Sequence, residues 1–391
     1  MKWIVLVTSI LFATTSQADL LVEKQRFEIK DFVTFGGQTI PEVAIGWESY
    51  GQLNKEKSNT ILITHYFTGS SHAAGKYHPN DPQAGYWDAL IGPGKAIDTN
   101  KYFVVSVDTL VNLNVGDPNV ITTGPASIDP RTNKPYGLTF PVVTIRDFVN
   151  VQKAVLTSLG IQKLHAVIGP SMGSMQAIDW AAAYPDWVPR MISVIGSAQA
   201  DPWTVSMLEQ WAIPIRLDAK WQGGNYEPSN PPMEGLTASL MFITQIALHP
   251  EYFINIGHSD AIKFSPLESA PLQDIRKSHS IVNWLRQRAR SRAEKMDANH
   301  LLYLVRANQL FIAGHDNDLS TGLSKQAAKT LFIPADKDLL LMPYLAKQAH
   351  LALISQGKSS DWQTLKGSAG HLEGVININQ KAAQIATFLA N

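Results

Sequence analysis

Cysteine is absent from the 391-residue chain. This absence excludes disulfide bonds, a thiolate nucleophile and zinc sites built on cysteine ligands. Small secreted domains often need disulfides because their cores are too small, but a chain of this length can bury a sizeable core. The sequence therefore predicts a protein that is stabilised by packing rather than by cross-links.

Charge is scarce and balanced. Charged residues make up 17% of the chain, and Lys+Arg and Asp+Glu number 33 each, which gives a formal net charge of zero at pH 7. Typical domains carry about 25% charged residues. The chain has no basic tract, acidic tail, internal repeat or low-complexity segment. These absences argue against a nucleic-acid partner.

Long apolar runs are missing as well, apart from a short one at the N-terminus. Met1 and Lys2 precede an apolar stretch at residues 3–14, and Ser16 and Ala18 are small residues at the positions that a signal peptidase reads. We interpret residues 1–18 as a signal peptide that is cleaved after Ala18, with a retained membrane anchor as the alternative. The expected location is therefore secreted or periplasmic, where soluble acyl-CoA is not expected, and no membrane span is expected in the mature chain.

One pentapeptide stands out at residues 169–173, with the sequence Gly-Pro-Ser-Met-Gly. It follows an apolar run and opens a helical one, so it has the form of a nucleophile elbow, in which Ser171 stands on a sharp turn between a strand and a helix. The helix N-terminus behind the serine can offer N–H groups to a developing oxyanion. The alternative is a glycine-rich turn with an ordinary serine.

Strand-like and helix-like segments alternate around this motif, which implies an α/β protein with a mostly parallel sheet and helices on both faces. Strands are predicted at residues 27–34, 42–50, 61–67, 102–107, 164–168, 191–195, 330–333 and 351–355. Helices are predicted at residues 145–159, 172–184 and 380–389. Together with the elbow, this alternation predicts the α/β-hydrolase fold.

The region from residue 201 to residue 308 interrupts the alternation and contains helical segments. We interpret it as a helical lid inserted over the catalytic face, with a separate helical domain of no catalytic role as the alternative. The predicted division is a first part of the core at residues 19–200, the lid at residues 201–308, and a second part of the core at residues 309–391.

A serine nucleophile needs a base and an orienting acid, which in this fold follow the serine in the order acid, then histidine. The strand at 330–333 leads to Asp336 and Asp338. Asp338 is favoured because an apolar stretch ending in proline follows it, whereas Asp336 would cap a helix. His371 lies in a loop near the C-terminus and is favoured as the base over His315, which would break the chain order.

The oxyanion hole requires two backbone N–H groups. Met172 supplies one, because it directly follows the nucleophile. The loop at residues 65–69 is expected to supply the other through Phe67, unless this segment is only the end of a strand.

Several sequence blocks resemble the homoserine O-acetyltransferase family of α/β hydrolases, and the likeness covers nearly the whole mature chain. The blocks lie at residues 50–54, 65–70, 87–99, 123–128, 140–147 and 169–184. The resemblance implies an acyl-enzyme on Ser171, with Asp338 and His371 completing the triad.

Two positions depart from that family. Its members have an aspartate after the catalytic histidine, which binds the amine of the amino acid, and an arginine in a lid motif, which holds the carboxylate. Here Leu372 and Leu240 occupy the matching positions. Glu373 is displaced by one residue from the missing acid. Since both charges are lost, we expect these two substrate-binding positions to hold a zwitterionic amino acid poorly.

These observations predict an exported serine acyl-hydrolase, esterase-like, that acts on a small-molecule acyl ester. Neither a cofactor nor a metal is expected. An acyltransferase of the homoserine O-acetyltransferase type and an inactive binding protein with the same fold are the alternatives, and a homodimer is left open.

Overall fold

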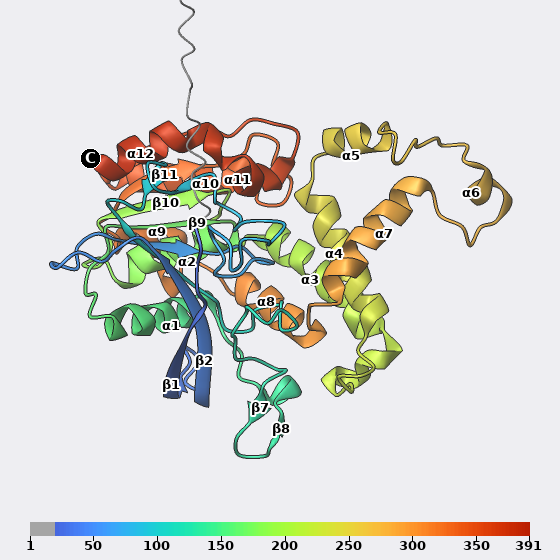
Figure 1. The fold of residues 1–391 in the computed structure, drawn as a ribbon, viewed down its shortest axis with the longest axis horizontal. Helices are drawn as coiled ribbons and strands as arrows, with labels where there is room; N and C mark the ends of the chain where they lie inside the picture. Colours follow the sequence, from blue (N-terminus) through green and yellow to red (C-terminus); the bar gives the residue numbers. More distant parts are fainter. Residues whose placement is uncertain (1–19) are drawn as a thin grey trace, which may run out of the picture.

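A twisted eight-stranded sheet forms the centre of the molecule, and helices lie on both of its faces (Figure 1). The computed structural model describes residues 20–391, so the predicted signal peptide at residues 1–18 lies outside the described residues. In spatial order the strands are β1 (Gln25–Val33), β2 (Thr39–Tyr50), β6 (Phe103–Val107), β3 (Thr60–Thr64), β9 (Ala166–Pro170), β10 (Arg190–Val194), β11 (Lys329–Ile333) and β12 (Ser360–Trp362).

The strands from β6 to β12 run parallel, while β1 and β2 form an antiparallel hairpin at one edge. The hairpin turns at Gly37, whose φ of 80° suits a residue without a Cβ atom. At the centre, Ile61 of β3 is aligned with Val104 of β6 on one side and with Ala166 of β9 on the other. The prediction of a mostly parallel sheet is confirmed.

Each central strand is buried on both faces, which is why it reads as an apolar run in the sequence. Ile61 and Ile63 pack into one hydrophobic core, whereas Leu62, between them, points into the other. One core contains helices α1 (Ile145–Ser158), α2 (Met172–Ala183) and α10 (Pro343–Ser355), and α12 (Ala382–Ala390) packs in the other. Packing on both faces holds the sheet in place, and the candidate site lies at the ends of its strands.

The predicted strand at residues 351–355 is wrong, because this segment is the last part of helix α10. Pro343 begins the helix, and Leu345, Ala349 and Leu353 recur at helical spacing on its buried side. A short apolar run does not distinguish a buried strand from one face of a helix. The last strand is instead β12, which begins five residues after α10 ends. The predicted strand at 61–67 also ends earlier, at Thr64.

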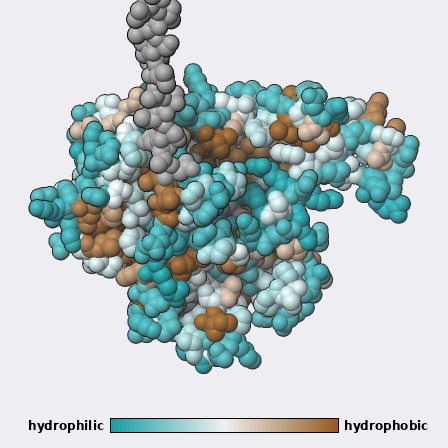
Figure 2. Space-filling view, viewed as in Figure 1, coloured by the Kyte–Doolittle hydropathy of each residue, from teal (hydrophilic) through white to brown (hydrophobic). Residues whose placement is uncertain are grey.

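Between β10 and β11 the chain forms only helices and loops. These helices are α3 (Pro202–Leu217), α4 (Met233–Ala247), α5 (Pro250–Gly257), α6 (Ser269–Gln273), α7 (Ser280–Ala293), α8 (Ala298–Gln309) and α9 (Leu319–Ser324). Helices α4 to α7 form an arm that projects from the body of the molecule (Figure 1), and brown apolar side chains are visible on this arm in Figure 2. The helical content agrees with the predicted lid, while its boundaries at 201 and 308 remain a prediction.

The remaining elements are short. They are the strand pairs β4 (Ile91–Gly92) with β5 (Ile97–Asp98) and β7 (Ile128–Asp129) with β8 (Lys134–Pro135), helix α11 (Glu373–Ile376), and the 3-10 turns η1 (Gly137–Thr139), η2 (Ala219–Gly224), η3 (Ala313–His315), η4 (Gly370–Leu372) and η5 (Ile378–Lys381). Within residues 20–391, no helix has the length and apolar character needed to cross a membrane.

Candidate active site

Ser171 stands on a strained turn between β9 and α2. Its φ of 57° and ψ of −122° lie outside the regions that a residue with a side chain ordinarily adopts. The turn fits because its two glycines pass close to β3: a Cβ atom on Gly169 would lie 2.0 Å from Thr64 Oγ1, and one on Gly173 would lie 2.1 Å from the Thr64 carbonyl oxygen. The strand–turn–helix arrangement predicted from the pentapeptide is present.

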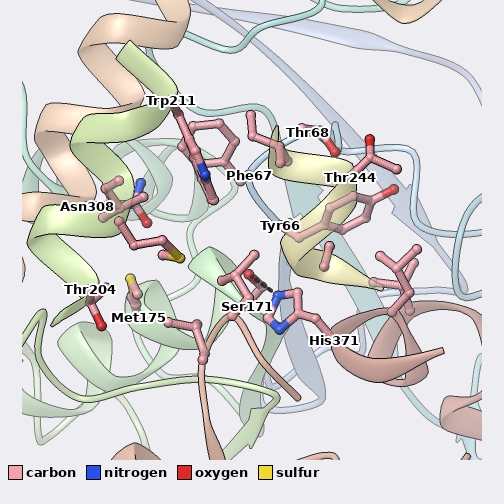
Figure 3. A pocket seen from close by; sticks show the side chains of 18 of the residues that line it. Tyr66, Phe67, Thr68, Ser171, Met175, Thr204, Trp211, Thr244, Asn308 and His371 are labelled. Atoms are coloured by element: carbon pink, nitrogen blue, oxygen red, sulfur yellow. Dashed lines mark hydrogen bonds between the residues drawn. The ribbon is translucent and has the colours of Figure 1, made fainter. Parts of the chain in front are cut away.

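The structure brings the three predicted triad residues together, and Figure 3 shows two of them, Ser171 and His371. His371 Nε2 lies 2.8 Å from Ser171 Oγ, and His371 Nδ1 lies 2.7 Å from Asp338 Oδ2. The other carboxylate oxygen of Asp338 accepts hydrogen bonds from the backbone N–H groups of Leu340 at 2.8 Å and Leu341 at 3.0 Å. The carboxylate is thereby fixed, and it can hold the imidazole with Nδ1 protonated and Nε2 free to accept the serine proton.

The rival residues lie elsewhere. Asp336 is exposed. His315 Nδ1 donates to Asp179 Oδ1 at 3.2 Å, and Arg146 donates to the same carboxylate at 2.6 Å, so His315 belongs to a separate buried ion cluster. Burial opposes ionisation of Asp179, but the hydrogen bonds from His315 and Arg146 prevail and lower its pKa. The geometry therefore separates the favoured residues from both alternatives.

Glu373 does not replace the missing acid of the family. Its side chain is buried and turned away from Ser171, where it accepts hydrogen bonds from the backbone N–H of Ala369 at 2.8 Å and from Asn377 Nδ2 at 2.8 Å. Both contacts hold the turn that carries His371. The role of Glu373 in this structure is thus to shape the η4–α11 segment.

Two backbone N–H groups, those of Phe67 and Met172, have no hydrogen-bond acceptor within residues 20–391. Met172 is the first residue of α2, where helical geometry leaves N–H groups unpaired. Phe67 follows β3 and lines the same pocket as Ser171 (Figure 3). Both donors are therefore available at the positions predicted for an oxyanion hole.

The loop that carries Phe67 is anchored by His65, which the sequence analysis did not single out. Its Nε2 accepts a hydrogen bond from the Thr109 N–H at 3.1 Å, and its Nδ1 donates to the Tyr66 carbonyl at 2.8 Å. Burial lowers the pKa of His65, which keeps the ring neutral. Asn112 adds a hydrogen bond to the Gly69 carbonyl at 3.0 Å.

A pocket with a cavity volume of about 90 Å³ lies over the serine. Its lining comes from the loop after β3, from α2, α3, α4, α7 and α8, and from the segments around Asp338 and His371. The lining residues are Tyr66, Phe67, Thr68, Ser171, Met175, Thr204, Met207, Leu208, Trp211, Ile243, Thr244, Ala247, Arg288, Arg292, Asn308, Leu340, Leu341, His371, Leu372 and Val375.

Of the two positions predicted to bear on substrate binding, one lines this pocket and the other does not. Leu372 contributes to the wall next to His371. Leu240 is fully buried on α4 and belongs to the hydrophobic core, while Ile243 and Thr244, on the next turn of α4, reach the pocket. The interpretation of Leu240 as a pocket residue is therefore wrong, because the sequence motif gave its place in the helix but not the face on which it lies.

Sequence reasoning missed the two arginines of the pocket, Arg288 and Arg292 on α7. The signal was present as four arginines at alternate positions, 286, 288, 290 and 292. Residues four apart share a helix face, so Arg288 and Arg292 point to the same side. No group of three or more metal-ligating side chains is found in the part of the chain that the structure describes.

Comparisons with known proteins agree with this geometry. Residues 122–244 match the family model of the alpha/beta hydrolase fold. Homoserine O-acetyltransferase from Methanosalsum zhilinae is 34% identical over 95% of this chain and 73% of its own length. The structure of homoserine O-acetyltransferase from Bacillus anthracis is 38% identical, with a TM-score of 0.91 over 95% of this chain and 98% of that one.

Esterase structures are more similar still. Esterase E22 is 64% identical to this chain, with a TM-score of 0.93 over 94% of this chain and 100% of its own. A leucine-to-aspartate mutant of E22 aligns with a TM-score of 0.94 over 95% of this chain and 100% of its own.

Proposed function

Because the chain belongs to the homoserine O-acetyltransferase family of α/β-hydrolase-fold enzymes, we propose that it is an exported serine acyl-hydrolase that cleaves small acyl esters. Proteins named as esterases and as acetyltransferases are both among its relatives. The chain is an acyl-transferring enzyme of this fold. The proposal concerns the acceptor of the acyl group, which we take to be water.

The proposed reaction follows from the hydrogen bonds of Ser171 and His371. His371 Nε2 takes the proton of Ser171 as the serine oxygen attacks the ester carbonyl carbon, and the N–H groups of Phe67 and Met172 stabilise the oxyanion. The imidazolium gives its proton to the departing alcohol oxygen, which leaves an acyl group on Ser171. His371 then deprotonates a water molecule, which attacks the acyl-enzyme, and the imidazolium returns the proton to Ser171 Oγ as the bond to the acyl group breaks and the carboxylic acid leaves.

Asp338 acts on His371 rather than on the substrate. Its carboxylate accepts the Nδ1–H, orients the ring and stabilises the imidazolium that forms during both steps. Its two backbone N–H partners keep the carboxylate in place.

We favour water as the acceptor of the acyl group because the pocket lining contains neither Asp nor Glu. An amino-acid acceptor would bring an ammonium group next to Leu372 and find no carboxylate there, because Glu373 is engaged behind the wall. Leaving an ammonium without a partner in a partly buried pocket is costly. Esterase E22, at 64% identity, supports the same choice.

The test compares two reactions of the same purified protein. We expect rapid release of p-nitrophenol from p-nitrophenyl acetate without an acceptor, and little consumption of acetyl-CoA with homoserine. Strong CoA-dependent transfer to homoserine would refute the hydrolase proposal.

Acetyl transfer to homoserine is the second candidate, and the 34% and 38% identities to homoserine O-acetyltransferases favour it. An inactive binding protein is the third. A fluorophosphonate probe separates the third from the other two, because it labels only an activated serine. Absence of labelling in the folded protein would refute both enzymatic proposals.

Export is proposed on the sequence of residues 1–18. N-terminal sequencing of the protein from fractionated cells tests it. We expect Asp19 as the first residue in the periplasm or medium, and an intact Met1 terminus in the cytoplasmic fraction would contradict export.

A homodimer is proposed on the exposed apolar side chains of the projecting arm. Ile254, Leu267, Leu272 and Ile275 are at least half exposed there. Exposed apolar side chains that cover one another at an interface would be removed from water. Light scattering on the purified protein should give twice the mass of the mature chain, and a replacement of Leu272 by Asp should shift it toward the monomer.

A further inference from the structure

The pocket holds positive charge that nothing in the described chain neutralises. Neither Arg288 nor Arg292 forms an ion pair within residues 20–391. Arg292 makes one hydrogen bond, from Nη1 to Thr244 Oγ1 at 3.3 Å, and Arg288 makes none. A guanidinium has five donors, so most of the hydrogen-bonding capacity of Arg292 is unused.

Arg292 is also poorly placed for an unpaired charge. Its side chain is largely buried, and that burial, together with the nearby charge of Arg288, lowers its pKa. Buried arginines are normally paired, because desolvation of an isolated charge is costly. Two like charges four residues apart on one helix face add repulsion to this cost.

Arg286 on the same helix also lacks an ion pair within residues 20–391, and Arg288 is exposed, so it is the burial of Arg292 that sets it apart. The nearby acids of the lid are paired with other cations. Arg290, between Arg288 and Arg292 in sequence, points to the other side of α7 and pairs with Glu234 at 2.7 Å. At the rim, Glu251 pairs with Lys337 at 2.6 Å. The acids of α4 and α5 are thus already engaged with other cations.

Thr244, the hydrogen-bond partner of Arg292, lies on the side of the pocket where the departing alcohol must sit. His371 Nε2 delivers its proton to the alcohol oxygen, so the alcohol lies beside His371. Figure 3 places Thr244, the partner of Arg292, and Tyr66 on this side of Ser171, and places Met175 and Trp211 on the opposite side. Thr204 and Asn308 also lie on the opposite side, where Met175 and Trp211 offer apolar contacts to a short acyl chain.

We propose that Arg292, assisted by Arg288, binds a carboxylate on the alcohol portion of the substrate, so that the preferred substrates are short acyl esters of hydroxycarboxylic acids that lack an amine. This proposal rests on the proposed hydrolase function and names its substrate class. A carboxylate matches the planar fork of a guanidinium and neutralises the pair. The site is distinct from the lid position of Leu240, which does not reach the pocket.

The test uses three acetate esters that differ in charge at the far end of the alcohol. They are 4-acetoxybutanoate, which is anionic, 4-acetoxybutanamide, which is neutral and of the same length, and acetylcholine, which is cationic. Acetate release gives kcat/KM for each. We expect the order anionic, neutral, cationic, with the anionic ester favoured over the amide by about 10- to 100-fold, as a charge-assisted hydrogen bond would give.

The variant Arg292→Gln should remove that preference. We expect KM for 4-acetoxybutanoate to rise by about 10- to 100-fold while kcat for the amide stays near the wild-type value. Arg292→Lys should restore part of the preference through its charge. Arg290→Gln is the matched control, because it removes an arginine of the same helix outside the pocket, and it should change neither substrate.

Each result has one meaning. If p-nitrophenyl acetate is not hydrolysed, the proposed function fails; if it is hydrolysed but none of the three esters is, the carboxylate proposal is refuted. If the esters are hydrolysed but the amide equals or exceeds the carboxylate, or if Arg292→Gln weakens both equally, the carboxylate proposal is refuted and the arginine has a structural role.

A measurement on the wild type covers the case in which Arg292→Gln does not fold. The product analogue 4-hydroxybutanoate should inhibit hydrolysis of p-nitrophenyl acetate at least tenfold more strongly than 4-hydroxybutanamide does. Equal inhibition would refute the proposal without any variant.

Discussion

Two buried polar regions of this enzyme use their hydrogen-bonding groups in opposite ways. One is a cluster around Glu48 on β2, and the other is the pocket around Ser171. We define the Glu48 cluster as Lys24, Glu48, Tyr50, Ser71, His72, Tyr77 and Asp108. Both regions contain charged groups with little exposure, so burial alone does not distinguish them.

Within the Glu48 cluster, the carboxylates have protein partners. Lys24 Nζ lies 2.7 Å from one Glu48 oxygen, and Tyr50 donates to the other at 2.9 Å. Asp108 accepts the backbone N–H of Ser71 at 2.7 Å and lies 3.4 Å from Lys24. This region is complete without a ligand, and Ser71 ties it to the loop that carries Phe67.

The pocket differs because several of its donors have no acceptor within residues 20–391. They include the N–H groups of Phe67 and Met172, the hydroxyl of Thr204 and most of the Arg292 guanidinium. Native proteins rarely leave buried donors unpaired. Within residues 20–391, unpaired buried polar atoms also occur away from the pocket, for example on Tyr86 and Tyr136. What distinguishes the pocket is that three residues with unpaired donors, Phe67, Thr204 and Arg292, line one cavity together with Ser171.

The largest expected effect comes from removing the hydroxyl of Ser171, because this change should affect catalysis in the pocket and leave the Glu48 cluster intact. Ser171→Ala should lower kcat/KM for p-nitrophenyl acetate by about 10⁴- to 10⁶-fold while the melting temperature stays unchanged, because only the proposed nucleophile is lost. Esterase kinetics and thermal melting measure the two quantities. Ser174→Ala is the control, since Ser174 is buried on the same helix and bonds only Ser193 at 2.6 Å. Near-wild-type activity of Ser171→Ala would contradict the proposed mechanism.

The next largest effect is expected at the acid. Asp338→Asn should lower kcat/KM by about 10⁴-fold, because an amide cannot keep Nδ1 of His371 protonated in the same way. Asp336→Asn is a matched control two residues away, and it should leave kcat/KM within about twofold, since Asp336 is exposed. If Asp336→Asn were the damaging change, the assignment of the acid would be reversed.

Ser171, Asp338 and His371 could be predicted because short sequence patterns identify them. The pentapeptide around Ser171 is typical of a sharp turn between a strand and a helix. Asp338 and His371 follow it in the chain order that is typical of this fold. The prediction of a strand at residues 351–355 failed for a physical reason, because a run of four apolar residues is too short to show the period of a helix.

Other parts of the site depend on three-dimensional relations that no local pattern contains. The significance of Arg292 lies in the absence of a counter-charge around it, which is visible only when α4 and α7 are packed together. Leu240 could be aligned to a motif, but the face of α4 on which it lies depends on tertiary packing. His65 appears in sequence only as a histidine after a strand.

Substitutions in the Glu48 cluster should change the stability of the fold rather than catalysis. Burial raises the pKa of Glu48, but the hydrogen bond from His72 and the Lys24 ammonium outweigh it and lower the pKa to about 2, against an ordinary value of 4.5. Glu48→Gln should reduce the free energy of unfolding at pH 7 by about 3 kcal/mol, because Lys24 then loses its closest carboxylate partner. Urea unfolding measures this change, and kcat/KM per folded molecule should fall by less than about tenfold.

The lowered pKa of Glu48 makes the stability of the Glu48 cluster depend on pH. Since the folded pKa lies below the unfolded one, the stabilisation is fully present above pH 4.5 and is lost as the pH falls toward 2. Glu48→Gln should lack this part of the acid sensitivity. Glu42→Gln is the control, because Glu42 pairs with Lys30 at the exposed edge and should leave the unfolding curve nearly unchanged. An unaltered acid transition in Glu48→Gln would contradict the assignment.

The smallest expected effect concerns the pocket around Ser171. It is informative because the substitution adds the acid that the pocket lacks. Leu372→Asp places a carboxylate on the pocket wall beside His371, where an incoming ammonium can pair with it. Transfer of acetyl from acetyl-CoA to homoserine should rise by about tenfold, and hydrolysis of neutral esters should fall, since a charge-assisted hydrogen bond stabilises the amino acid and the apolar wall is lost. Leu372→Asn keeps the shape without the charge and should not gain transfer. Because the new carboxylate also lies in the pocket with Arg292, the preference for 4-acetoxybutanoate should weaken in the same variant; transfer gained with that preference unchanged would show that the amine and carboxylate positions act independently.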